Sequence, residues 1–213
     1  MTKLDKIPLS DTPLRATVAF YIQGGAPWLL KSFAITDITS STPIATFLTT
    51  AASDLSNLLA DAKGDAAAQA ALIQLDKPSP ISTSLVAKKV LEGKIIATVS
   101  GSTLSLGRRT IKFVAKNSSH SSHPIKVRPA RIRSRADKFV LEGVSFFWDV
   151  LEGTRRCELS KFVDGKRTEV GRFVAANARE REGVLLVDGN EVDRIVAALT
   201  CVAVLNRVDA FRI

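Results

Sequence analysis

An apolar run near the C-terminus, residues 195–205, limits the folds that this chain can adopt; one threonine interrupts it. The run is apolar on every side at helical spacing, which excludes an amphipathic helix lying on the surface. Its valines leave two strands as the alternative, but no turn residue divides the run, so one helix is favoured. Its length is about half that of a membrane span. Such a helix must be enclosed by the rest of the chain.

Most of the remaining chain has a sequence pattern typical of short strands and turns. Apolar and polar residues alternate at 145–151, as they do in a half-buried strand. The Asp164-Gly165 pair between two strand-like runs predicts a tight hairpin, because both central residues must accept positive φ. Residues 43–49 are also read as an extended run. The sequence predicts a β-rich fold, α+β by content: a closed or nearly closed antiparallel β-barrel around the apolar C-terminal helix.

Two segments do not show this strand-and-turn pattern. Residues 1–14 are expected to form a polar tail, because Pro8 and Pro13 oppose regular structure. Residues 15–213 then form a single domain, whose size allows a sizeable core. A helical insertion is predicted at residues 54–75.

The leucine spacing predicts that the insertion begins as a helix, that Gly64 interrupts it and that the alanine-rich residues beyond resume it. At the apolar run, Asn190 is expected to cap the helix, with Asp193 as its capping-box partner. Residues 209–213 are expected to return as a final strand.

The sequence favours a cytoplasmic location, with peripheral attachment at membranes. Charged residues near the N-terminus replace the apolar core of a signal peptide, and no transmembrane segment is expected. Cys157 and Cys201 are too few for a disulfide framework and are read as buried thiols, which suits a reducing compartment.

The net charge of +9 is concentrated in one stretch. Residues 108–138 hold ten basic residues against Asp137 alone, while the rest of the chain has twenty of each sign. A field of this kind attracts polyanions such as lipid headgroups, nucleic acid or acidic proteins.

Alternation within this stretch predicts a basic ridge on one face of a strand. Basic and apolar residues alternate on both sides of Pro129, which suggests an edge strand or a bulge. Guanidinium groups at roughly 7 Å spacing fit phosphate oxygens. The alternative is that the charges keep an edge strand from pairing with other chains. The candidate anion- and lipid-binding residues are Arg108, Arg109, Lys112, Lys126, Arg128, Arg131, Arg133 and Arg135.

Five short motifs of the C-terminal third occur in a characteristic order. They are Ser145-Phe146-Phe147-Trp148, Cys157-Glu158-Leu159, Val170-Gly171-Arg172-Phe173, Gly183–Val187 and Asp193–Ala197. In this order they resemble the tubby C-terminal-like superfamily of tubby proteins, phospholipid scramblases and plant LURP-one-related proteins. The resemblance covers roughly residues 139–213 and implies a barrel threaded by a hydrophobic helix. Tubby domains bind phosphoinositide headgroups through basic side chains, so it also implies binding of anionic lipid.

No catalytic motif accompanies these features. His120 and His123 are too few for a metal site and are read as part of a solvated loop. Residues 101–107 lack the ending of a phosphate-binding loop. We therefore expect no enzyme, no metal and no cofactor.

The interpretation is a non-catalytic binding module that docks on anionic phospholipid or phosphoinositide surfaces through the ridge. One alternative is a nucleic-acid-binding protein that uses the same ridge. It ranks second because Phe113 is the sole aromatic residue of the basic stretch, and RNA readers usually stack bases on aromatics. A protein-interaction or structural module is the other alternative. The sequence does not specify the oligomeric state.

Overall fold

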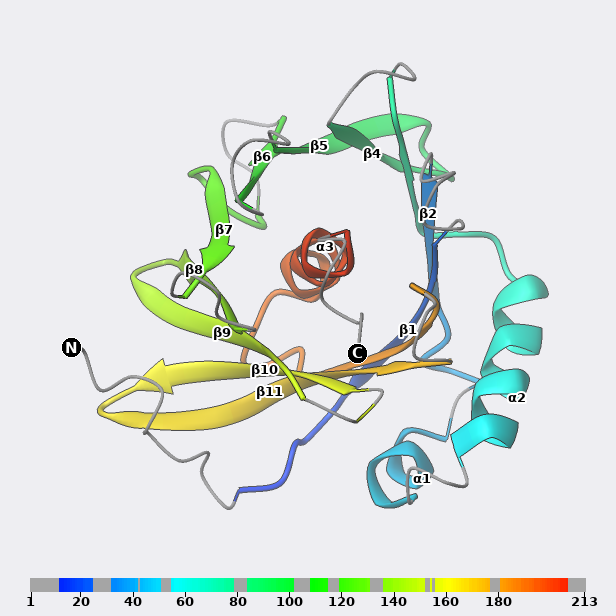
Figure 1. Ribbon diagram of the computed structural model, residues 1–213. Helices are drawn as coiled ribbons and strands as arrows, with labels where there is room; N and C mark the ends of the chain where they lie inside the picture. The colour runs from blue at the N-terminus through cyan, green and yellow to red at the C-terminus, as the bar shows by residue number, and fades with distance from the viewer. Residues whose placement is uncertain are drawn as a thin grey trace.

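The protein folds as a closed antiparallel β-barrel with a helix through its middle, as the sequence predicted (Figure 1). The structure is a computed structural model that describes residues 12–24, 32–41, 43–50, 55–78, 84–101, 108–114, 119–130, 136–151, 154, 156–176 and 181–206. Each strand pairs with the next strand along the chain, and β12 closes the ring on β1. The predicted strand at 209–213 and the tail up to residue 11 lie outside the described residues.

The barrel has twelve strands. They are β1 (Val18–Gly24), β2 (Ser32–Asp37), β3 (Ile73–Asp76), β4 (Leu85–Lys89), β5 (Lys94–Ser100), β6 (Arg109–Phe113), β7 (Ile125–Pro129), β8 (Ala136–Leu141), β9 (Val144–Val150), β10 (Arg156–Val163), β11 (Lys166–Ala175) and β12 (Gly183–Val187). The predicted hairpin turn between β10 and β11 is confirmed, with Asp164 and Gly165 both at positive φ.

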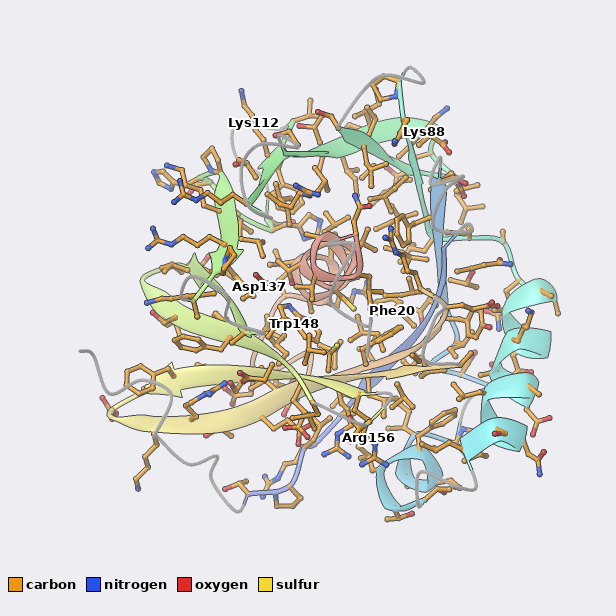
Figure 2. All side chains as sticks on the ribbon, in the orientation of Figure 1. Phe20, Lys88, Lys112, Asp137, Trp148 and Arg156 are labelled. Carbon is orange, nitrogen blue, oxygen red and sulfur yellow. The ribbon has the colours of Figure 1, made fainter. Side chains whose placement is uncertain are left out.

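The apolar run forms α3 (Arg194–Leu205), which lies inside the barrel. Side chains alone fill a barrel of about eight strands, so a ring of twelve leaves room for a helix about 10 Å across. Every residue from Ile195 to Leu205 is at most 4% exposed. Large side chains such as Phe20 and Trp148 point inward toward α3 (Figure 2). None of the helices in the described ranges is long and apolar enough to cross a bilayer.

The N-terminal cap of α3 differs from the predicted one. The carboxylate of Asp193 accepts hydrogen bonds from the backbone N–H groups of Ile195 and Val196, both at 2.9 Å, so Asp193 is the cap. Asn190 lies in the preceding turn, where its own N–H donates to Asp188. A capping carboxylate accepts hydrogen bonds from the backbone N–H groups two and three residues later in the sequence. Asp193, unlike Asn190, has this spacing from the first turn of α3.

Two helices cover one outer side of the barrel, as Figure 1 shows: α1 (Ile44–Thr49) and α2 (Leu55–Ala67). The extended run predicted at 43–49 was therefore wrong. Its β-branched residues favour a strand locally, but Phe47 is buried in the apolar cluster formed by these helices and the outer faces of β1 and β12. Tertiary packing thus outweighs local propensity in α1.

The helical insertion is confirmed only in its first part. The helix α2 continues through Gly64, which faces open space. The packing of the buried opposite face of α2 outweighs the small loss of helix stability that a glycine causes. The helix ends at Ala67, and the last part of the predicted insertion forms strand β3 instead. The apolar residues Ile73 and Leu75 alternate with polar ones and point into the barrel.

The basic strand β7 is not an edge strand, contrary to the reading of Pro129. It pairs with β6 on one side and with β8 on the other. Proline has no backbone N–H to donate to a neighbouring strand, but no described hydrogen bond is lost at Pro129. The pairing of β6 with β7 ends at Val127, and on the side of β8 it is the N–H of Ala130 that donates, to the carbonyl of Ala136. A closed ring has no free edge to protect, so the edge-protection interpretation of the basic residues fails.

Candidate anion-binding face

Alternating side chains of β7 divide basic from apolar residues, as predicted. Ile125 and Val127 are buried inside the barrel, while Lys126 and Arg128 are exposed on its outer surface. Lys112 of β6 is exposed in the same way and points away from α3 in Figure 2. Residues two apart on a strand are roughly 7 Å apart, so Lys126 and Arg128 form a short ridge.

A fourth cation, Lys138 of β8, extends this ridge onto the next strand. It lies directly opposite Arg128 in the β7–β8 ladder, and its Nζ is 5.5 Å from the centre of the Phe147 ring. The sequence contained the signal for it, because Lys138 alternates with Asp137 and Phe139, which are both buried. Lys112, Lys126, Arg128 and Lys138 are called the basic face from here on.

The described outer side of β6, β7 and β8 carries no carboxylate. Asp137, the one acid in this part of the sequence, is 1% exposed and points into the barrel, beside Trp148 in the β8–β9 ladder (Figure 2). The basic face therefore has no acidic neighbour on its own strands. Among the described residues, none of its four members forms an ion pair with a carboxylate.

The other predicted residues are distributed differently. Arg108 is exposed immediately before β6. Arg131, Arg133 and Arg135 lie outside the described residues.

Arg109 does not belong to the basic face, because it shares the inward side of β6 with Ile111 and Phe113. Burial lowers the pKa of its guanidinium, and the nearby carboxylate of Asp137 partly offsets this. The Arg109 side chain passes Gly101, where a Cβ would come within 2.4 Å of its Nη1 atom. Grouping the residues by charge placed Arg109 on the ridge, whereas the strand period assigns it to the interior.

The buried Arg181 lies at the same end of the barrel as Arg109. Burial lowers its pKa to about 10, with a further contribution from the charge of Arg109. Its Nη1 donates to Oδ1 of Asn206, the residue that follows α3. The C-terminal end of a helix favours cations, so both arginines fit there. No pattern in the sequence around Arg181 predicted this burial, which depends on strands from opposite sides of the ring.

The outer side of β9 to β11 also carries charge, but there the two signs balance. Arg172 donates to both carboxylate oxygens of Glu169 at 2.7 Å, and Arg167 pairs with Asp149. Burial raises the pKa of Glu158, and the neighbouring Glu169 raises it further. This compensated surface contrasts with the basic face beside it.

The His-Ser-Ser-His loop is tied to the helix cap rather than to a metal-ligand cluster. Nδ1 of His120 lies 2.9 Å from Oδ2 of Asp193, and its ring lies 5.3 Å from that of Phe113. His123 interacts with the neighbouring Ser122. Across the described residues, no three His, Cys, Asp or Glu side chains gather in a way that would hold a metal ion.

Comparison with known proteins adds no identification. The chain matches no protein-family model, no curated protein and no solved structure.

Proposed function

We propose that this protein is a non-catalytic binding module of tubby-like fold that docks on anionic phospholipid or phosphoinositide surfaces. The basic face supplies the contact. It acts through charge and shape, without a chemical step, and the module attaches peripherally at the cytoplasmic side of a membrane.

The observation that carries this proposal is a set of like charges that the fold does not need. Arg128 lies directly opposite Lys138, and Lys126 follows two residues before Arg128 on the same strand. Like charges in such positions destabilise a sheet. Because the barrel is closed, edge protection does not explain them. An anionic ligand does, since it turns a repulsive cluster into a binding surface.

The expected affinity follows from the number of charges. Each basic residue near an anionic bilayer contributes about 1 kcal/mol, so the four members of the basic face supply about 4 kcal/mol. That corresponds to millimolar binding, which favours reversible attachment. Because exposed charges are screened within about 10 Å at 0.1 M salt, binding should weaken steeply as salt rises.

The test is co-sedimentation with vesicles of phosphatidylcholine alone or mixed with phosphatidylserine or a phosphoinositide. The variant Lys126→Gln/Arg128→Gln removes two charges from the basic face. Its control is Ser56→Glu/Asn57→Asp, which lowers the net charge equally on the exposed side of α2, the helix that packs on β1 and β12 across the ring from β7. Acids also suit the first turn of a helix, so the control should fold.

We expect the wild type and the control to bind anionic vesicles but not neutral ones. The basic-face variant should bind anionic vesicles only weakly. Equal binding to neutral and anionic vesicles, or equal binding by the two variants, would refute the proposal. Strong, salt-sensitive binding to oligonucleotides without lipid binding would favour the nucleic-acid alternative. The described outer side of β6 to β8 carries no aromatic side chain for base stacking, which favours lipid.

A further inference from the structure

The exposed large apolar side chains of the described residues gather at one end of the barrel. This is the end at which β12 leads into α3, called here the entry end. The strands alternate in direction around the ring, so β4, β6, β8 and β10 end there, and β5 begins there. The exposed apolar residues at these strand ends are Val90, Leu91, Ile95, Val114, Val140 and Val163.

The most exposed of them is Leu91, at the tip of the β4–β5 hairpin. Its side chain is 83% exposed, beside Val90 at 41% and Ile95 at 46%. The turn is closed by a hydrogen bond from the Gly93 N–H to the Val90 carbonyl, and Gly93 has φ +62. Such turns favour Gly, Asn, Asp or Ser, so folding does not require a leucine at the tip.

The next strand continues this apolar tip. Val114, 59% exposed, follows β6, and its N–H donates to the carbonyl of Ile96 on β5. The tip and Val114 therefore belong to one surface over three consecutive strands.

Lysines surround this surface. Lys88 and Lys94 are exposed on the two strands of the hairpin, and Lys112 and Lys126 follow on β6 and β7. None of these four forms an ion pair among the described residues, whereas Lys89 is neutralised by Glu92 at 3.0 Å. An apolar tip surrounded by unpaired lysines matches the chemistry of an anionic membrane interface: hydrocarbon below and phosphate at the headgroup level.

We propose that the entry end is the part of the protein that inserts into an anionic phospholipid bilayer, with Leu91 as the penetrating residue. This inference rests on the proposed function and adds an orientation to it. Val90 and Ile95 lie at the boundary between headgroups and acyl chains, and the lysines contact headgroup phosphates. Of the basic face, Lys112 and Lys126 are nearer the bilayer than Arg128, which lies further from the entry end.

Leu91→Cys, labelled with a polarity-sensitive fluorophore, tests insertion directly. The two native cysteines, Cys157 and Cys201, are each 1% exposed, so the introduced thiol is the reactive one. The control is Gln23→Cys, labelled in the same way, because Gln23 is exposed at the end of β1 on the opposite end of the barrel. We expect a blue shift at position 91 with mixed phosphatidylserine vesicles, and no shift at position 23.

Leu91→Asn tests the contribution of the apolar side chain without changing the charge. Losing the burial of one leucine should weaken vesicle binding about tenfold or more. Leu91→Phe, which keeps an apolar tip, should bind at least as tightly as the wild type. The melting temperatures of both variants should match that of the wild type, because the tip makes no buried contact.

The outcomes separate the two proposals. A wild type that fails to bind anionic vesicles overturns both. Vesicle binding with no blue shift at position 91 and no loss in Leu91→Asn overturns the insertion alone and leaves docking through the basic face. Binding of Leu91 to an acidic protein, without the vesicle-induced shift, also overturns the insertion.

Discussion

The buried hydrogen bond between α3 and the barrel wall gives the sharpest test of the fold. Nε1 of Trp148 donates to Oγ1 of Thr200 at 3.1 Å, and both residues are fully buried. Thr200→Val keeps the shape of the side chain but removes the acceptor. An unsatisfied buried N–H costs about 1–3 kcal/mol. A chain of this length loses about 2–4 °C in melting temperature per kcal/mol, so a midrange cost lowers the melting temperature by about 4–8 °C.

The matched measurement is a double-mutant cycle with Trp148→Phe, followed by thermal and urea unfolding. Trp148→Phe destabilises by itself, because it removes part of a buried ring. In that background Thr200→Val should cost much less, since no donor remains to be left unsatisfied, and the coupling should be about 1–2 kcal/mol. An equal cost of Thr200→Val in both backgrounds, or a rise in melting temperature in the wild-type background, would refute the placement of α3.

Three further predictions follow from the same interior and wall. Asp193→Ala removes the cap of α3 and should cost about 1–2 kcal/mol in urea unfolding, whereas Asn190→Ala, at the cap position first expected, should cost far less. Burial raises the folded-state pKa of Glu158 above its ordinary value of 4.5, so its ionised form opposes folding at neutral pH. Glu158→Gln should therefore be more stable than the wild type at pH 7, and the difference should vanish below that ordinary value; a difference that grows on acidification would contradict this. Cys157 and Cys201 are both buried, and burial raises the pKa of the Cys201 thiol. Both thiols should therefore react with a thiol reagent only after unfolding, and rapid reaction of the native protein would count against the buried interior.

The parts of the fold that sequence reasoning predicted are those in which a local pattern and the tertiary structure agree. The run in α3 is apolar on all sides because the barrel surrounds it. Lys126 and Arg128 alternate with Ile125 and Val127 because one side of β7 faces α3 and the other faces solvent. The Asp164-Gly165 turn was predictable because its backbone conformation excludes most other residues.

The errors occur where distant packing decides the structure. Phe47 turns a β-prone segment into helix α1 because it packs on the outer wall of β1 and β12, which no local pattern records. Arg181 is buried because the barrel brings it to the end of α3. In contrast, the inward side of Arg109 and the outward side of Lys138 were both encoded in the strand period, and counting charges obscured them.

The barrel encloses α3, and its lysine- and arginine-bearing wall is proposed to face an anionic surface. Hydrogen–deuterium exchange with and without phosphatidylserine-containing vesicles tests both the enclosure of α3 and the binding of this wall to an anionic surface. We expect vesicles to slow exchange in β6, β7 and the β4–β5 hairpin and to leave exchange in α2 unchanged. In both conditions α3 should be the slowest-exchanging segment. Rapid exchange in α3 without vesicles, or vesicle protection confined to the α2 side of the barrel, would contradict these expectations.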